Sequence, residues 1–443
     1  MAVLDGVMLG IALPAITVHF NIGIAQSQWV ITGYLIASAG LYVFFGKLSD
    51  YIGKIKLYIA GWVLFIVSSL LCGLAPGMNE LIMFRIIQGI GASMVAGVAT
   101  AIVFHAFPPQ ERGKSMGMLA ASAALGALIG PGFGGLVVDA MGWQSIFFIN
   151  IPVGIVLLVL AFKYLKMPEI TSKNIKIDWV GTAALFVSIA SLILVCVETG
   201  NSASISLPII AYGIVFAIST LGFIAYESSC KNPILDLSVF GNRMFTLPLV
   251  GGMLLVIANS VPNILAPFYF QGVMGYSASQ VGLLFMIQPL IMFIMAPFGG
   301  WLYDKKQWKY SASAGAIIMA ASFLLLAYSF YVQNIWAIVL SFVIWGTGMG
   351  LFLSPNTTEA MSALPREKSA VASSIMSMAR SLSVALGVSL ASMMTSLWLS
   401  SGGYGSTLLS IGSSAIANGI GTVTLAAGGL LIVSTIICAM RNI

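Results

Sequence analysis

Two polar side chains inside an apolar run are the first residues of this sequence that could handle charge within a membrane. Arg85 and Gln88 fall in the run at 80–104. In an α-helix, a spacing of three residues places both on one face. A guanidinium inside a bilayer costs about 2.5 kcal/mol or more, so Arg85 is expected to face a polar cavity or a partner acid. The alternative is that Arg85 snorkels from near the helix start to the outer surface.

Asp5 is the only acidic residue early in the first apolar run, at 2–20. Burial disfavours the charged form of a carboxyl, so a buried Asp5 could bind and release a proton, or meet a cationic substrate. With only four residues before it, Asp5 could instead lie hydrated near the headgroups, without a coupling role. Because this run is barely long enough to span, we expect the native polypeptide to begin upstream of Met1. Asp5, Arg85 and Gln88 are therefore our candidates for proton coupling and substrate contact.

The elements that must position these side chains are membrane helices. Hydrophobic residues make up 59% of the 443 residues, charged residues only 7%, and the mean hydropathy is +1.03. Soluble domains carry about 25% charged residues, so an all-α polytopic membrane protein is predicted. Apolar runs near twenty residues predict about fourteen transmembrane helices. These runs lie at 2–20, 28–46, 57–75, 80–104, 115–138, 145–165, 178–197, 207–226, 244–270, 279–301, 311–330, 336–358, 370–399 and 421–440.

The connections between the runs alternate in charge. Lys and Arg occur in every second connection and after the last run, whereas the intervening connections contain none. Cytoplasmic loops carry the excess of basic residues, so both termini and all basic loops are predicted on the cytoplasmic side of the cell membrane. The net charge of +6 thus reflects topology in the lipid bilayer. No basic aromatic patch remains to predict nucleic-acid binding.

A weak internal repeat divides the chain. Gly300 to Lys305 echoes Gly46 to Asp50, and 364–369 echoes 108–113, both at a separation near 255 residues. We therefore expect an N-terminal six-helix bundle, a linker with two extra transmembrane helices, and a C-terminal six-helix bundle. Such repeats are typical of alternating-access transporters with a substrate cavity between the halves. The three predicted parts are 1–165, 166–243 and 244–443.

The segment at 46–56 carries one Asp and three Lys between two apolar runs, so it is expected to form a short aqueous turn. Gly46 and Gly53 suit a tight reversal, and Asp50 could cap the next helix or pair with a cation such as Lys54. The alternative is an ordinary basic turn between two helices.

The pattern Gly-x-Leu-x-Asp-x-x-Gly-Lys in this segment resembles the loop between the second and third helices of the major facilitator superfamily. Our hypothesis from this resemblance is a conformational latch between the halves. It comprises Gly46, Asp50, Gly53 and Lys54, together with Asp304 of the repeat.

Further motifs carry the same resemblance. Arg-x-x-Gln-Gly-x-Gly at 85–91 resembles the fourth-helix motif of proton-coupled members, in which the arginine is associated with proton transfer. Glycines spaced by four in the fifth helix favour close packing of another helix, and the proline there favours a kink. Generic small-residue packing is the alternative. The motif resembles one found in exporters of the superfamily, and its residues are Gly126, Gly130, Pro131, Gly134 and Gly135.

The segments at 4–14, 143–152 and 227–240 are similar to the fourteen-span drug:proton antiporters of the superfamily. The resemblance implies the major facilitator fold, with two six-helix bundles plus two extra helices near 178–226. It also implies export of amphiphilic or cationic small molecules in exchange for protons.

Four other polar residues lie in predicted helices and are possible cavity residues: Asn259, Asn263, Gln288 and Arg380. Asn259 and Asn263 share a face at a spacing of four and could bind a ligand, although bridging between helices is favoured. Arg380 lies about 18 Å of helix rise beyond Lys368, too deep for easy snorkelling, so it is expected to face the interior.

Several chemistries are not indicated. The four cysteines have no metal-ligand spacing, neither histidine has a nucleophile and an acid beside it, and no phosphate-binding loop motif occurs. We therefore predict a transporter rather than an enzyme, without metal or cofactor, acting as a monomer on amphiphilic substrates and protons. The alternatives are an importer or symporter of a metabolite and, more remotely, a membrane enzyme or receptor.

Overall fold

The computed structural model describes residues 1–22, 24–165, 177–201, 206–230, 233–306, 310–402 and 413–440. These residues form helices and no strand. Thirteen helices are long and apolar enough to cross a membrane. The first helix, α1 (Ala2–His19), adds 18 residues, about 27 Å at the usual rise per residue. The predicted all-α fold with about fourteen spanning helices is confirmed.

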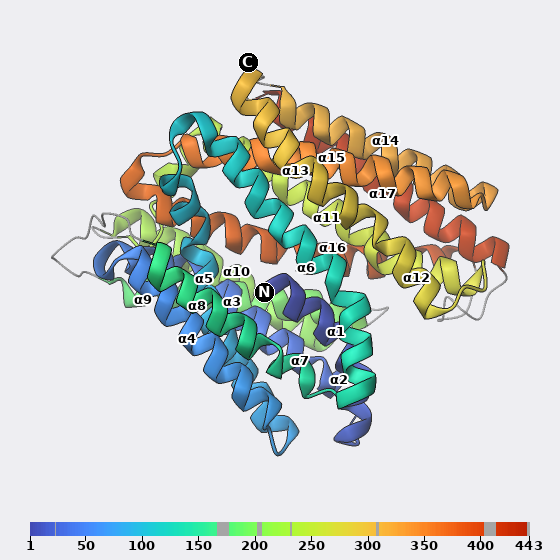
Figure 1. Cartoon of the computed structure of the whole chain (residues 1–443), viewed down its shortest axis with the longest axis horizontal. Helices are drawn as coiled ribbons and strands as arrows, with labels where there is room; N and C mark the ends of the chain where they lie inside the picture. The colour runs from blue at the N-terminus through green and yellow to red at the C-terminus, as the bar shows by residue number, and fades with distance from the viewer. Residues whose placement is uncertain are drawn as a thin grey trace.

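The first bundle contains the helices that surround Asp5 and Arg85. Its elements are α1, α2 (Ile24–Ser27), α3 (Trp29–Ile52), α4 (Lys54–Gly73), α5 (Met78–Ala106), η1 (Pro109–Glu111), α6 (Arg112–Met141), α7 (Ser145–Phe148) and α8 (Asn150–Tyr164). Helix α5 packs against α3 and α4, and α1 packs along α6. Figure 1 shows α6 changing direction where it passes α1.

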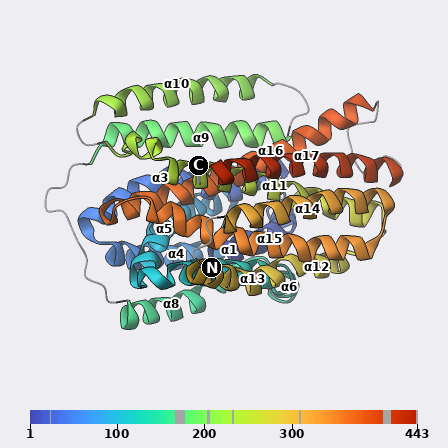
Figure 2. The ribbon, with the colours of Figure 1, turned by 90° about the horizontal axis from the view of Figure 1, so that it is seen from above.

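Two further helices lie on one side of the molecule, α9 (Trp179–Asn201) and α10 (Leu207–Ser229). Figure 2 shows them side by side along one edge, with α10 outermost. Helix α9 contacts α3 and α16, one helix from each bundle, whereas α10 packs chiefly on α9. A hydrogen bond connects α9 to the second bundle. In it, the Ser389 hydroxyl of α16 donates to the carbonyl of Cys196 on α9 at 2.5 Å.

The second bundle follows a short segment at the same end of the molecule as the basic loops. Its elements are η2 (Leu237–Gly241), α11 (Arg243–Gly272), α12 (Ala278–Phe285), α13 (Ile287–Lys306), α14 (Ser311–Val332), α15 (Ile335–Ser362), η3 (Arg366–Lys368), α16 (Ser369–Ser401) and α17 (Ser413–Met440). The Lys368 ammonium lies 2.6 Å from Asp236. This ammonium and Ser238 hold the pKa of the Asp236 carboxyl below its ordinary value, at about 2.

The chain reverses within the predicted segment 46–56, but the turn is much shorter than expected. Helix α3 continues through the charged residues to Ile52, and α4 begins at Lys54. Gly53 alone breaks the helix, with φ of 102°, a backbone conformation that L side chains rarely adopt. A single glycine is therefore sufficient to reverse the chain, and the charges lie on the last turns of one helix and the first turn of the next.

Other predicted boundaries also differ from the structure. The run predicted at 279–301 forms two helices, α12 and α13, and the run at 145–165 forms α7 and α8. The last helix begins at Ser413, eight residues before the predicted start at 421. The first residues of this helix are small or polar, so the sequence did not show them as part of an apolar run. The helix nevertheless packs against α14.

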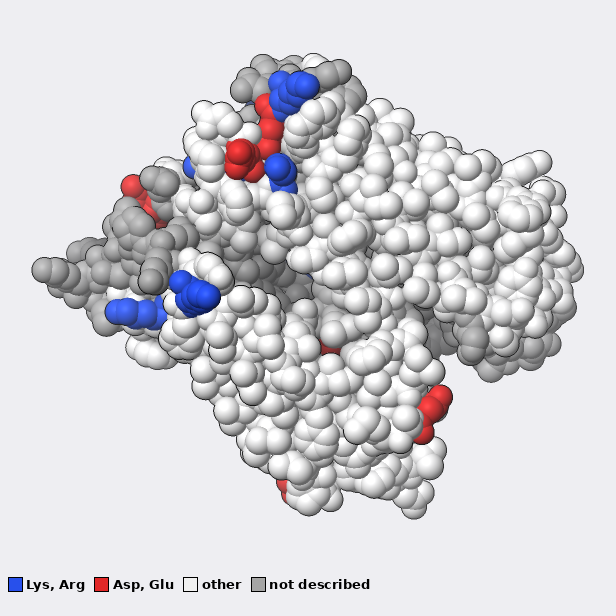
Figure 3. Space-filling view, viewed as in Figure 1, with Lys and Arg blue, Asp and Glu red and all other residues white. Residues whose placement is uncertain are grey.

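The two bundles meet most closely at the end that carries the basic residues. Helix α6 packs against α13, and α16 packs against α3 and α5. A Cβ on Gly300 would collide with the carbonyl of Gly113, and a Cβ on Gly117 would collide with that of Ala296. Toward the other end the bundles diverge, and the surface is hollowed between them (Figures 1 and 3). The fold is therefore closed at its basic end and open at the opposite end.

A carboxylate from one bundle caps a helix of the other at this closed end. Asp304 of α13 accepts hydrogen bonds from the backbone N–H groups of Gly113 at 2.9 Å and Lys114 at 2.8 Å. These are the unpaired donors at the start of α6, where the positive end of the helix dipole also favours an anion. The Ser354 hydroxyl donates to the Gly113 carbonyl at 2.5 Å. Asp304 thus joins the bundles through backbone atoms.

Replacing Asp304 by alanine should loosen the closed end. Loss of a helix cap costs about 1 kcal/mol, or roughly a five-fold shift in an opening equilibrium. A cysteine at Ser377, whose hydroxyl bonds to Ala96 across the bundles, should react about five-fold faster with a maleimide in Asp304→Ala protein that lacks the native cysteines. Asp139→Ala, which removes an exposed acid at the far end of α6, is the control. Equal labelling in all three proteins would contradict the cap.

Candidate functional site

Asp5 and Arg85 form an ion pair buried in the first bundle. Asp5 Oδ2 lies 2.8 Å from Arg85 Nη1, and the side chains are 2% and 1% exposed. Asp5 lies on α1 and Arg85 two turns into α5, so the pair joins two helices that are 80 residues apart in sequence. The snorkelling position considered for Arg85 and the hydrated position considered for Asp5 do not occur in this structure.

Arg85 has further partners that fix its guanidinium. Its Nε donates to the backbone carbonyl of Val30 at 3.1 Å, and Nη1 also donates to Gln88 Oε1. The Tyr34 ring lies beneath the guanidinium, 4.4 Å from its central carbon. A planar guanidinium can serve these partners simultaneously because its donors point in several fixed directions. Arg85 therefore connects α5 to α1 and to α3.

The network extends to two more helices through neutral side chains. Gln88 donates to the Ser69 hydroxyl on α4 at 2.6 Å, and Asn150 at the start of α8 donates to Asp5 Oδ1 at 2.7 Å. The motif at 143–152 contains Asn150, but sequence reasoning gave it no role. Nothing in the sequence distinguishes Ser69 from other helix serines, and Tyr34 was missed for the same reason.

Both carboxylate oxygens of Asp5 accept a hydrogen bond, one from Arg85 and one from Asn150. An ionised carboxylate accepts at both oxygens, whereas a protonated one must donate at one of them. Arg85 has no acceptor site, so it can pair only with an Asp5 oxygen that still accepts a hydrogen bond. The contact between α1 and α5 therefore depends on the negative charge of Asp5, since a charge-assisted hydrogen bond is stronger than a neutral one.

The glycines of α6 form the surface on which α1 lies. A Cβ on Gly130 would lie 2.9 Å from Val7, and one on Gly134 would lie 3.0 Å from Met8. A Cβ on Gly126 would make ordinary contact with Leu4 at 3.4 Å, whereas a Cβ on Gly135 would meet nothing within 4 Å. The Pro131 side chain is outside the described part of the structure. Gly126, Gly130 and Gly134 thus bring α6 against the helix that carries Asp5.

The residues of the predicted latch occupy different positions. A Cβ on Gly46 would collide with Ser374 of the second bundle, so Gly46 allows α3 and α16 to approach closely. Asp50 pairs with Lys54 at 3.2 Å within the first bundle, across the break at Gly53. The carboxylate that crosses between bundles is that of Asp304.

The other predicted polar residues lie in the second bundle. Asn259 accepts a hydrogen bond from the indole N–H of Trp345 at 3.0 Å and so bridges α11 and α15, as favoured from the sequence. Asn263 donates to the carbonyl of Asn259 on its own helix at 2.7 Å. Gln288 lies 3.9 Å from the sulfur of Met292. Arg380 is exposed on α16.

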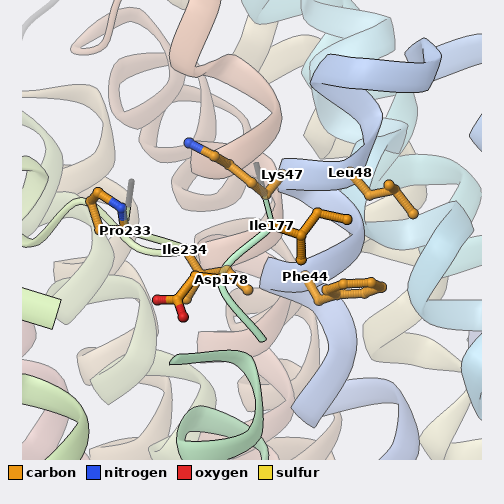
Figure 4. A pocket seen from close by; sticks show the side chains of 7 residues that line it. All are labelled: Phe44, Lys47, Leu48, Ile177, Asp178, Pro233 and Ile234. Carbon is orange, nitrogen blue, oxygen red and sulfur yellow. The ribbon is translucent and has the colours of Figure 1, made fainter. Parts of the chain in front are cut away.

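A small pocket at the basic end is separate from this network. It is a shallow depression between α3, the start of α9 and the segment after α10 (Figure 4). Its lining is mostly apolar and comprises Phe44, Lys47, Leu48, Ile177, Asp178, Pro233 and Ile234. The contacts that close the basic end separate this pocket from the open end. We assign it no function.

The sequence is similar to those of known membrane transporters. The sequence profile of the Major Facilitator Superfamily matches residues 1–388. The chain is 34% identical to the riboflavin transporter RibZ of Clostridioides difficile over 387 residues, covering 87% of this chain and 84% of that protein. It is 32% identical to the multidrug transporter protein MdtP of Bacillus subtilis over 389 residues, covering 87% and 71%.

Two further similarities point in the same direction. The chain is 30% identical over 401 residues to the multidrug export protein EmrB of Escherichia coli, covering 90% of this chain and 78% of that protein. The crystal structure of the human organic anion transporter MFSD10 superposes with a TM-score of 0.64 at 13% sequence identity, covering 98% of this chain and 97% of that one. At this identity the structural similarity concerns the fold alone.

The Asp5–Arg85 pair predicts a non-additive pair of substitutions. Arg85→Gln leaves the Asp5 carboxylate buried without its cation, at a cost of about 3–5 kcal/mol. Adding Asp5→Asn removes that charge, so the double variant should unfold at a higher temperature in detergent than Arg85→Gln alone. Adding Asp139→Asn instead, at an exposed acid, should restore nothing. A double variant less stable than Arg85→Gln would contradict the pairing.

The glycine surface predicts a position-specific effect on α6. Gly130→Leu must displace Val7 of α1 and should cost about 1–3 kcal/mol through overpacking. Because α1 carries Asp5, transport into proteoliposomes should slow as well. Gly135→Leu is the matched control, since its side chain enters open space, and it should be close to wild type in both thermal stability and transport rate. Equal behaviour of the two variants would show that the α1–α6 contact is unimportant.

Proposed function

The chain belongs to the major facilitator superfamily, and on that premise we propose that it is a proton-coupled secondary transporter that exports amphiphilic small molecules by alternating access. The observation that carries the proposal is the buried Asp5–Arg85 pair, in which both carboxylate oxygens are occupied by donors from other helices. Buried ionisable residues in membrane helices mark proton and substrate pathways. We take one chain as the functional unit because it contains both bundles.

The direction in which the transporter faces follows from charge. Because basic loops favour the cytoplasmic side, the closed basic end is assigned to the cytoplasm and the open end to the outside of the cell membrane. Under this assignment we propose a cytoplasmic C-terminus, whereas Met1 lies inside the first bundle, one helical turn before Asp5. We also retain the division into 1–165, 166–243 and 244–443, with the substrate path between the first and last parts. The conformation is accordingly the outward-facing member of the transport cycle.

The proposed cycle begins with a proton that reaches Asp5 from the open side. Protonation of Asp5 weakens its pairing with Arg85 and loosens α1 from α5. Helix α1 lies on the glycine surface of α6, and the start of α6 is capped by Asp304 of the other bundle. A movement of α1 can therefore reach the contact that closes the cytoplasmic end. Release of the proton to the cytoplasm would restore the pair after substrate has bound.

Transport of a metabolite is the second candidate function. It is favoured by the 34% identity to a protein named as a riboflavin transporter, which covers most of both chains. The helix network described above would serve a proton-coupled importer equally well. Export is preferred because the glycine motif of α6 resembles that of exporters and several relatives are named for multidrug export or resistance.

The coupling role of Asp5 is tested by transport in proteoliposomes. Wild-type protein should move a panel of lipophilic dyes against their gradient when a pH gradient is imposed, and riboflavin in the same panel tests the second candidate. Asp5→Asn should lose accumulation driven by the pH gradient, because the amide cannot bind and release a proton, while downhill equilibration continues.

Asp139→Asn, which removes an exposed acid at the outer end of α6, should behave as wild type in that assay. The coupling role would be refuted by a well-folded Asp5→Asn protein that accumulates dye to the wild-type level. Accumulation of riboflavin alone, with every dye excluded, would favour the metabolite transporter.

A further inference from the structure

Arg380 is an exposed arginine in the interior of a membrane-spanning helix. It is the twelfth residue of α16, which runs for 33 residues. Tyr42 of α3 in the other bundle interacts with its guanidinium electrostatically. An exposed arginine that faces the other bundle lies on the wall of the space between the bundles rather than at the lipid surface.

The helix face that carries Arg380 is turned toward the first bundle. One turn earlier, Ser377 donates to the Ala96 carbonyl of α5 at 3.0 Å, the cross-bundle hydrogen bond at the closed end. Residues at spacings of three and four share a helix face, so Arg380, Val384 and Val388 continue that face toward the open end. Val384 and Val388 are each 40% exposed. The exposed part of this face therefore begins at Arg380, where Tyr42 of the first bundle still lies beside α16, and Arg380 forms the floor of the opening.

Arg380 has no acid to balance its charge. Within the described part of the chain it makes no ion pair and donates no hydrogen bond. Asp5, the buried acid of α1, is occupied by Arg85 and Asn150. The Asp5–Arg85 pair carries no net charge. The charge between the bundles that remains unbalanced is therefore that of Arg380, and it is positive.

We propose that Arg380 makes the opening between the bundles a binding site for anionic amphiphiles, in which the guanidinium holds a carboxylate or sulfonate. The inference rests on the proposed transport function because it takes this opening as the substrate path. Guanidinium groups bind such anions through two parallel hydrogen bonds, which are stronger away from bulk water. The apolar face formed by Val384 and Val388 suits the hydrophobic body of the ligand. Permanent cations, which we expected from the sequence, are disfavoured by repulsion.

Binding of two related dyes tests the proposal without any gradient. Carboxyfluorescein is anionic and rhodamine 123 is cationic, and both share the xanthene ring system. Fluorescence anisotropy titrations of the purified full chain in dodecyl maltoside should give a dissociation constant at least about ten-fold lower for carboxyfluorescein, as expected for one charge-assisted hydrogen-bonded contact.

Variants at Arg380 should change this preference in a graded way. Arg380→Gln should remove it, Arg380→Glu should reverse it, and Arg380→Lys should keep its sign but weaken it, because an ammonium lacks the planar pair of donors. Arg243→Gln is the matched control, since it removes the same charge from an exposed position at the start of α11 outside the opening. It should leave both dissociation constants unchanged.

Two results would overturn the inference. One is tighter binding of rhodamine 123 than of carboxyfluorescein by the wild-type protein, which decides the matter even if the Arg380 variants do not fold. The other is an unchanged preference in folded Arg380→Gln protein. Because the titration requires no proton gradient, loss of proton coupling in transport would refute the proposed function while leaving this preference intact.

Discussion

The buried ion pair between Asp5 and Arg85 is the interaction on which the arrangement of the first bundle depends. Neither charge could remain in the bundle interior alone, because an unpaired buried charge costs several kcal/mol. Each is stable there because α1 and α5 hold them 2.8 Å apart, and because Asn150, Gln88 and the Val30 carbonyl satisfy further donors and acceptors. The polar network thus places α1, α3, α4, α5 and α8 relative to one another.

Helix α6 provides the physical connection from that network to the second bundle. Along its second half, Gly130 and Gly134 contact α1 next to Asp5. At its start, the backbone N–H groups of Gly113 and Lys114 are capped by Asp304. One helix therefore contacts both the proposed proton site and the closed end, which gives a route of packed atoms between them. Substitutions along α6 test whether a change at the proposed proton site alters the contact at the closed end.

Much of the site was predictable from the sequence because charge in an apolar run is so costly. That cost identified Asp5 and Arg85 one by one, and Gln88 followed from its spacing of three from Arg85, although the pairing of residues 80 positions apart needed the structure. Asn150 and Ser69 were missed because neutral polar residues carry no comparable penalty. The turn predicted at 46–56 was too long for a related reason: charged side chains are tolerated on the end of a helix near the membrane surface, and Gly53 alone was needed for reversal. The sequence repeat equated Asp50 with Asp304, whereas only Asp304 caps a helix of the other bundle in this conformation.

The central claim is that protonation of Asp5 releases the outward-facing conformation, and spin-label distances test it most directly. Labels on cysteines replacing the exposed Leu136 of α6 and Leu283 of α12, in protein without its native cysteines, report the separation of the bundles at the open end. Asp5→Asn removes the charge that pairs with Arg85, so it should shift the protein from the long distance of the wild type toward a shorter one. Asp139→Asn should keep the wild-type distance. An Asp5→Asn protein that also keeps the wild-type distance would contradict the account.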